Sequence, residues 1–437
     1  MIARTVLEWG SLPYGEGENQ VPEWAADRVA SVAKASTLGG EDGTRIVTLG
    51  RKELRVAQVV GVVAADGCTL EILPKIDFSH ENDDPVNIGR IRRQLVHMLA
   101  VALDIEVASG SITTLGWQQE NLLEILIGLF VRKLADLTRQ GMPRRYVGCE
   151  DELPMLRGRL DVTRQFTVLA ANVQKLACRY DALSPNIALN QIVKAAVLRL
   201  MRVARSQENQ RYLRELAFTY AEIADVSVTS LPWHNVVLDR TNSGWHELIE
   251  LAKLLLGDRF QTTSLGGGRG YSLLFEMNIL FEEYIAKMLK RALRASGLTV
   301  HAQSGRLYCL EDMDTHARRF MTMPDILVAR GPWLEMIIDT KWKRLIARID
   351  DPKQGMSQAD VYQMMAYGQV YGCERLLLLY PHHGGLGKAE GVIACHRVTG
   401  SNGMLMTATI DISARRGIVE RLRDLYDQAG QQLARAT

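Results

Sequence analysis

The stretch from Met323 to Lys343 constrains the fold more than any other part of the chain. Two short apolar runs, residues 326–328 and 334–338, flank the sequence Arg-Gly-Pro-Trp at residues 330–333. Gly-Pro between two such runs predicts a β-hairpin. Any fold for this chain must therefore place these two strands side by side.

The predicted hairpin brings two carboxylates together. If the turn centres on Pro332, Asp325 lies directly opposite Asp339, and like charges at opposed positions destabilise a strand pair. A divalent cation between the two carboxylates would remove the repulsion, and hard oxygen ligands suit Mg²⁺ or Mn²⁺. Since strand side chains alternate between faces, Lys341 shares the face of Asp339 while Thr340 points the other way.

The order Pro-Asp, hairpin, Asp-X-Lys resembles the PD-(D/E)XK nuclease core. The resemblance implies that Asp325, Asp339 and the backbone carbonyl of Thr340 bind the metal. It also implies that Lys341 orients or activates the attacking water and stabilises the charge that develops on the phosphate. An exposed hairpin with a cross-strand Asp–Lys pair has the same sequence and is the structural alternative.

A helix and a buried strand are predicted after the hairpin. Ser357-Gln-Ala-Asp360 is typical of a capping box that opens a helix to about residue 371, and Gln363 and Tyr367 share one face of it. The apolar run 375–381 is typical of a fully buried strand. The Gln-X-X-X-Tyr spacing resembles the RecB-like branch of nucleases, where this motif and Lys343 would support the active site and the DNA backbone. A capped amphipathic helix with Tyr367 in the core is the alternative.

Residues 272–295 precede the hairpin and are predicted to form one long helix with a broad apolar stripe. A helix at this place often lends such a nuclease core a further carboxylate. Glu282 is the candidate for that metal ligand. A solvated surface glutamate is the structural alternative.

The charge balance limits how this chain can bind nucleic acid. Its formal net charge is +2 over 437 residues, which is too balanced for strong general affinity to DNA, where phosphate neutralisation supplies most of the binding. Contact with DNA must then come from a partner or from a local patch. The basic residues near the hairpin form the candidate patch, with a solvated face as the alternative: Arg318, Arg319, Arg330, Lys341, Lys343, Arg344 and Arg348.

Several protein classes are disfavoured by what the sequence lacks. The six cysteines contain no CxxC pair, which favours reduced thiols in a cytoplasmic protein over a zinc site or a disulfide framework. We expect no signal peptide and no membrane span, because no apolar stretch approaches the roughly 20 residues that a span needs. There is no Gly-Lys-Ser/Thr phosphate loop, so we expect no nucleotide bound by this chain itself.

The predicted organisation is an α+β multidomain protein. We expect a small β-rich domain at residues 1–85, a mainly helical partner-docking region at 86–265, and an α/β PD-(D/E)XK core at 266–437, with Gly266–Gly270 as a linker. Strands are predicted at 6–9, 45–49, 54–63, 68–73, 393–398 and 404–410, and helices at 25–35, 88–103, 120–139, 185–205, 207–224, 245–255 and 417–433.

Residues 146–161 interrupt the helical region with a polar segment that contains Gly and Pro. We expect it to be an extended strand or loop that projects from the helices. Arg157 and Arg159 are candidates for contact with the phosphates or carboxylates of a partner. A plain salt-bridged loop is the alternative.

Taken together, several blocks in a fixed order resemble the McrC family, the nuclease subunits of McrBC systems that restrict DNA with modified cytosine. The blocks lie at residues 156–161, 180–190, 274–284, 323–325, 338–341, 360–367 and 379–382. The resemblance implies a Mg²⁺-dependent endonuclease that cuts double-stranded DNA. It also implies a partner, a McrB-like AAA+ GTPase hexamer that recognises methylated DNA and whose GTP hydrolysis the McrC subunit stimulates.

Two other functions remain open at this point. One is a self-sufficient RecB-like repair or recombination nuclease, which would cut with metal alone. The other is a non-catalytic adaptor that activates a GTPase and keeps a silent nuclease fold. The presence of Asp325, Asp339 and Lys341 argues against the adaptor.

Overall fold

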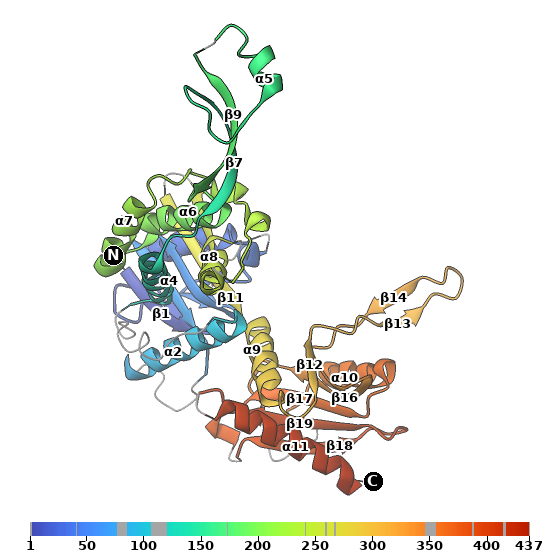
Figure 1. The fold of residues 1–437 in the computed structure, drawn as a ribbon. Coiled ribbons are helices and arrows are strands. Elements are labelled where there is room, and N and C mark those ends of the chain that lie inside the picture. Colours follow the sequence, from blue (N-terminus) through green and yellow to red (C-terminus); the bar gives the residue numbers. More distant parts are fainter. Residues whose placement is uncertain are drawn as a thin grey trace. The chain divides into compact units, whose positions relative to one another are not determined.

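The computed structural model describes residues 2–40, 42–76, 85–105, 120–172, 174–240, 242–257, 260–265, 268–345, 355–386, 389–413 and 417–436. The chain is a mixed α/β protein with several sheets (Figure 1). Its contacts divide it into two compact units, one of residues 1–123 with 259–437 and one of residues 124–258. All six cysteines are free thiols. In the described part of the chain, no helix is long and apolar enough to cross a membrane.

The first unit begins with a five-stranded sheet in the order β1-β6-β5-β11-β10 and a small sheet in the order β2-β4-β3. The predicted strand 54–63 is in fact two strands, β4 and β5, separated at residues 57 and 58. Asp66 and Gly67 form the turn that joins β5 to antiparallel β6. The elements are β1 (Ile2–Leu7), β2 (Ser11–Pro13), α1 (Glu23–Lys34), η1 (Thr37–Gly39), β3 (Val47–Leu49), β4 (Glu53–Val56), β5 (Val59–Ala65), β6 (Cys68–Leu73) and α2 (Pro85–Ala102).

The helix predicted from Ser272 is wrong over its first part. Strand β10 (Phe260–Leu265) and strand β11 (Gly268–Glu276) form a hairpin, and β11 pairs with β5. Residues 271–275 are buried, and a short run of buried apolar residues fits a central strand as well as a helix. The linker prediction fails for the same reason, since Gly268–Gly270 lie in β11, while residues 266 and 267 fall outside the described part. The helix proper is α9 (Met277–Ala292), which continues directly from β11.

A six-stranded sheet in the order β12-β15-β16-β17-β19-β18 forms the rest of the first unit. Helix α10 packs on one face through residues that contact Ile337, Leu376 and Leu378, and helices α9 and α11 line the other face at Met336 and Ile338. The elements are β12 (Thr299–Ala302), β13 (Tyr308–Glu311), β14 (Arg318–Met321), β15 (Ile326–Arg330), β16 (Trp333–Thr340), α10 (Gln358–Tyr371), β17 (Arg375–Pro381), η5 (Gly384–Leu386), β18 (Gly391–Arg397), β19 (Met404–Ile410) and α11 (Ile418–Ala436).

The hairpin prediction is confirmed, with one refinement. Strands β15 and β16 are antiparallel, and Ile326 pairs with Ile338, so the register leads on to Asp325 and Asp339 as predicted. Nearer the turn the pairing shifts by one residue, because a β-bulge stands between the Ala329–Leu334 and Val328–Met336 pairs. The bulge leaves residue 335 without a partner on β15. Beyond the bulge, the pairing has the register that leads to Asp325 opposite Asp339.

The second unit is mainly helical and is shorter than the predicted region 86–265, because α2 belongs to the first unit. It carries a three-stranded sheet in the order β7-β9-β8. The segment predicted to be extended is confirmed as a strand, β7, and Figure 1 shows β7 and β9 reaching away from helix α6 and carrying helix α5 at their far end. The elements are α4 (Leu122–Gln140), β7 (Arg145–Leu153), β8 (Arg159–Leu160), α5 (Val162–Thr167), β9 (Leu176–Ser184), α6 (Ala188–Val203), α7 (Gln207–Thr219), η2 (Val228–Ser230), η3 (Trp233–Asn235), η4 (Ser243–Trp245) and α8 (His246–Leu256).

Candidate active site

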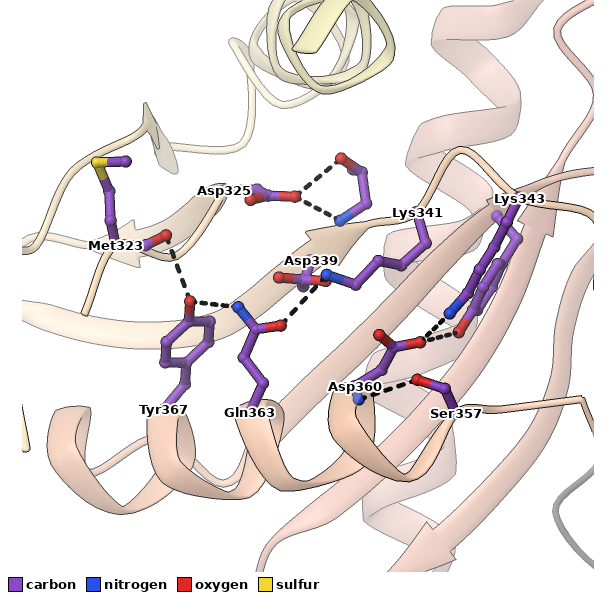
Figure 2. Close-up of polar contacts among 11 residues, drawn as sticks. Met323, Asp325, Asp339, Lys341, Lys343, Ser357, Asp360, Gln363 and Tyr367 are labelled. Carbon is purple, nitrogen blue, oxygen red and sulfur yellow. Dashed lines mark hydrogen bonds and ion pairs between the residues drawn. The ribbon is translucent and has the colours of Figure 1, made fainter. Parts of the chain in front are cut away.

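The structure brings the two predicted acids and the predicted lysine to one end of the six-stranded sheet (Figure 2). Asp325 directly precedes β15, Asp339 lies near the end of β16, and Lys341 directly follows that strand. The Nζ atom of Lys341 lies 2.6 Å from Oδ2 of Asp339, whose side chain is 1% exposed. Asp339 and Lys341 therefore share one side of the strand, as the alternation of side chains predicted.

Thr340 departs from the prediction. Its side chain was expected to point away from the acids, but its hydroxyl donates a hydrogen bond to Asp325 Oδ2 at 2.9 Å. The backbone N–H of Thr340 donates to the same oxygen at 2.7 Å. The alternation rule applies within a regular ladder, whereas Asp325 lies just outside β15 and its carboxylate turns toward these two donors. Thr340 thus fixes the orientation of Asp325.

The acids at this end of the sheet are hard to ionise. Burial raises the pKa of Asp339 to about 6, and the charge of Asp325 adds to the effect. Burial also raises the pKa of Asp325, and this effect exceeds the lowering by the two hydrogen bonds from Thr340. Burial and then the charge of Asp325 raise the pKa of Glu282 to about 7. Burial, and for Asp339 and Glu282 also the charge of Asp325, opposes negative charge on these groups, and a bound cation would offset both effects.

The two aspartates fit a divalent cation. Asp339 Oδ1 is buried and has no hydrogen-bond partner among the described residues, so one hard oxygen is left available. Mg²⁺ is often held by one or two carboxylates, with water completing its shell. Glu282 does not complete a protein cluster: across the described ranges, no three His, Cys, Asp or Glu side chains are grouped to hold a metal. Glu282 is carried by α9, which covers the sheet face opposite α10. The carbonyl of Thr340 as a ligand stays a prediction.

Lys341 is held as a cation. Burial lowers its pKa, but Asp339, Asp325 and Asp360 outweigh that effect, so the pKa is raised. Its ammonium also donates to Oε1 of Gln363 at 3.3 Å. A group that keeps its proton supplies positive charge and a hydrogen-bond donor at neutral pH, and it is a poor general base.

Gln363 and Tyr367 continue from Lys341 as a chain of hydrogen bonds, drawn in Figure 2. The Gln363 amide nitrogen donates to the Tyr367 hydroxyl at 2.7 Å, and that hydroxyl donates to the carbonyl of Met323 at 3.4 Å. The chain orients the amide so that its oxygen faces Lys341. Helix α10 is therefore joined both to the lysine and to the segment that leads into Asp325.

Lys343, a predicted support residue, pairs with an acid that was predicted only to cap a helix. Its ammonium contacts Asp360 Oδ2, and the backbone N–H of Asp360 donates to the Ser357 hydroxyl at 3.2 Å, which confirms the predicted cap. Asp360 precedes Gln363 by three residues and Tyr367 by seven, which puts all three on one helix face. That spacing was the signal that could have assigned Asp360 to the site.

The predicted basic patch is not continuous. Arg330 lies at the turn end of β15, away from Asp325, and pairs with Glu335 at 2.5 Å. Arg318 and Arg319 lie on the separate β13–β14 ribbon, and Arg348 falls outside the described residues. Of the predicted set, the basic residues that follow β16 directly are Lys341, Lys343 and Arg344.

Arg157 and Arg159, the predicted docking residues, belong to the second unit. The guanidinium of Arg157 lies 4.0 Å from the centre of the Tyr180 ring. Arg159 on β8 lies opposite Arg179 on the antiparallel strand β9. Both arginines line a cavity of about 820 Å³. Two glutamates of β7 form ion pairs in the same unit: Glu150 pairs with Arg179 at 3.0 Å, and Glu152 pairs with Arg164 at 3.1 Å.

Comparison with solved structures finds the same fold. A chain described as part of a "refined half-complex from tetradecameric assembly of Thermococcus gammatolerans McrB AAA+ hexamers with bound McrC" is 19% identical, with a TM-score of 0.71, and the match covers 98% of this chain and 99% of that one. A chain of the T. gammatolerans McrBC complex is 22% identical, with a TM-score of 0.53, and the match covers 67% of this chain and 88% of that one.

Sequence comparison agrees. The "type IV methyl-directed restriction enzyme EcoKMcrBC" of Escherichia coli K12 is 22% identical over 281 residues, which cover 60% of this chain and 77% of that protein. The family model described as McrBC 5-methylcytosine restriction system component matches residues 54–381, well over half of the chain and the whole of the candidate site. The chain therefore belongs to the family of McrBC 5-methylcytosine restriction system components.

Proposed function

We propose that this chain is the nuclease subunit of a McrBC-type restriction complex and that its six-stranded sheet is a PD-(D/E)XK core. One observation carries the proposal: Asp325, Asp339 and Lys341 meet at one end of β15 and β16, with the lysine 2.6 Å from Asp339. A structural ion pair would not need two buried acids. Burial raises the pKa of both acids and the charge of Asp325 raises that of Asp339 further, an arrangement typical of a functional site.

In this proposal each residue has a defined part. Asp325 and Asp339 would hold Mg²⁺ or Mn²⁺, with the carbonyl of Thr340 as a further ligand. When bound, such a cation polarises a phosphoryl oxygen and lowers the pKa of its water. Lys341 keeps its proton, so it orients the attacking water and offsets charge that develops on the phosphate. Thr340 holds Asp325, and Gln363 holds Lys341.

The partner of the chain would be an AAA+ GTPase hexamer. The match to a chain from McrB hexamers with bound McrC extends over nearly the whole of this protein and motivates that proposal. The net charge of +2 agrees with a nuclease that depends on a partner for its affinity to double-stranded DNA. The purified chain should then cut methylated DNA only with Mg²⁺, the partner and GTP present. Cutting with Mg²⁺ alone would favour a self-sufficient nuclease, and stimulation of GTP hydrolysis without any cutting would favour an adaptor.

The ribbon of β7, β8 and β9 is the proposed docking surface. It presents exposed apolar side chains together with Arg157 and Arg159, and Tyr146, Met155 and Phe166 are each more than 70% exposed. Large exposed apolar side chains on an extended element favour a role in binding another protein. Arginines are enriched at such interfaces because the guanidinium pairs bidentately with carboxylates and phosphates.

Replacing both arginines should weaken docking. The double variant Arg157→Ala, Arg159→Ala is expected to lower the stimulated rate of GTP hydrolysis about tenfold or more at a fixed partner concentration, because truncated interface arginines are common hot spots. The measurement is phosphate release over a titration of the chain.

The matched control is Arg211→Ala with Arg214→Ala, two exposed arginines on α7 of the same unit. The control should stimulate GTP hydrolysis as the parent does. Unchanged stimulation by the Arg157, Arg159 variant would reject the ribbon as the docking surface.

A further inference from the structure

A cleft of about 600 Å³ opens beside the candidate active site, within the first unit. One side comes from the N-terminal sheet and the other from the residues that follow β16. Its lining includes Glu8, Trp9, Lys75, Trp342, Lys343 and Arg344. Neither the family match nor the proposed catalytic residues assign it a role.

The floor of the cleft is built from hydrogen bonds between the two sides. Trp342 is buried and its indole N–H donates to Glu8 Oε1 at 2.8 Å, while the backbone N–H of Lys75 donates to the same oxygen at 3.0 Å. The amide of Gln58 donates to the carbonyl of Trp342 at 2.9 Å. The Trp342 ring also lies 5.4 Å from the ring of Phe281 on α9. The N-terminal sheet thus holds the residue directly between Lys341 and Lys343.

The walls of the cleft are cationic. Lys75 comes from the N-terminal side, and Lys343 and Arg344 come from the segment after β16. Lys343 is anchored by Asp360, and the Arg344 side chain donates to His383 Nδ1 at 3.3 Å. The carboxylate of Glu8 faces the floor, where it already accepts two hydrogen bonds. Three positive side chains outnumber the two carboxylates beside them, Glu8 and Asp360, and this balance favours an anionic ligand.

An exposed indole completes the cleft. Trp9 is 63% exposed, and its backbone has a φ of 59°, a left-handed conformation that a bulky side chain rarely adopts. Such strain persists only where the surroundings enforce it, and it often marks a functional position. Large aromatic side chains normally bury their faces, so Trp9 presents a flat surface that is available for stacking.

Cations beside an exposed aromatic ring are typical of a site for a nucleic-acid strand, with phosphates on the cations and a base on the ring. The volume lies in the range of small-molecule pockets, so the cleft takes a short piece of one strand and not both strands of a duplex. Trp342 and Lys343, which line the cleft, directly follow Lys341 in the chain, so a strand held at Lys341 would continue into it.

Resting on the nuclease function proposed above, we propose that this cleft binds an unpaired segment of DNA next to the scissile phosphate, with Trp9 stacking on a base and Lys75 contacting a phosphate. The N-terminal sheet would then hold substrate as well as scaffold the core. Lys341 and Trp342 would connect the two sites along the backbone.

Binding can be tested without cleavage. The full chain is titrated against fluorescein-labelled duplexes in EDTA, one fully paired and one with a short unpaired segment, and anisotropy is followed over a series of salt concentrations. Trp9→Ala should weaken binding to the unpaired segment about fivefold or more, and Trp9→Phe should keep most of the affinity, because phenylalanine also stacks. Lys75→Ala should weaken binding and lower the slope of log affinity against log salt by about 0.7–0.9.

The matched controls are Trp24→Ala and Lys34→Ala, which replace an exposed tryptophan and an exposed lysine. Both residues lie on α1, which packs against β5 and β6 of the N-terminal sheet. Both variants should bind like the parent, and thermal melts check that every variant is folded. No binding by the parent, parental affinity in Trp9→Ala and Lys75→Ala, or an equal loss on fully paired DNA would each overturn the proposal. Cleavage with the partner, GTP and Mg²⁺ is measured in parallel. A parent that never cuts rejects the proposed nuclease, whereas normal cutting with unaffected cleft variants rejects only the cleft.

Discussion

Replacing Lys341 by alanine is expected to abolish DNA cleavage and to leave the stimulation of GTP hydrolysis intact. The lysine is the cation beside Asp339, and its raised pKa keeps it charged at neutral pH. Loss of one preorganised group that stabilises transition-state charge lowers a catalytic rate about 100- to 1000-fold. The proposed docking ribbon lies in the other unit, so docking to the partner should survive. Cleavage of methylated plasmid and phosphate release from GTP, measured on the same samples, check both parts.

A control variant distinguishes the loss of a catalytic group from a general loss of positive charge. Lys290→Ala removes an exposed lysine of α9 in the same unit and should cut like the parent. Cleavage at the parental rate by Lys341→Ala would overturn the assigned role. Loss of cleavage together with loss of GTPase stimulation would point to misfolding or to a surface that serves both functions.

Replacing Asp339 by asparagine should remove cleavage and, in the absence of metal, make the protein more stable at neutral pH. The pKa of Asp339 is about 6 in the folded chain, above its ordinary value of 3.8. A raised carboxyl pKa gives stability that is complete below pH 4 and is lost as the pH rises through 6. Asparagine does not titrate, so the variant keeps that stability. The shift corresponds to about 2–3 kcal/mol in the free energy of unfolding.

Urea unfolding in EDTA from pH 4.5 to pH 8 tests this result. The difference between Asp339→Asn and the parent should grow between pH 4.5 and pH 6.5 and then level off. Adding Mg²⁺ should stabilise the parent and leave the variant unchanged, because a ligand stabilises only the state that binds it. Asp427→Asn, at an exposed position of α11, serves as the control. A stability difference that stays constant over the whole pH range would contradict the assignment.

The geometry of the candidate site was largely predictable because it depends on local periodicity. Alternation along a strand placed Lys341 beside Asp339, and helical spacing placed Gln363 beside Tyr367. The pairing of Ile326 with Ile338 followed from the position of the turn, although the bulge near residue 335 could not be foreseen. Such features need only the short stretch of sequence that contains them.

The rest depended on contacts between distant parts of the chain. The run from Tyr271 to Phe275 is buried and, apart from Ser272, apolar, and only its pairing with β5 makes it a strand. Thr340 turns toward Asp325 at a strand end, where alternation no longer applies. The hydrogen bond from Trp342 to Glu8 joins residues more than three hundred positions apart, so no local sequence pattern could predict it. In these three places, tertiary contacts determine the local structure and override the preference of the local sequence.

The direct passage from β11 into α9 affects how relatives of this protein can recombine. Strand β11 lies between β5 and β10, and the helix that grows from it packs on the sheet of the candidate site. A gene fusion joined at the glycine run would therefore give a hybrid whose N-terminal sheet contains a strand from the other parent. Exchange of the C-terminal half between homologues should succeed only where β5 of one parent can still pair with β11 of the other, so the two halves are expected to evolve together.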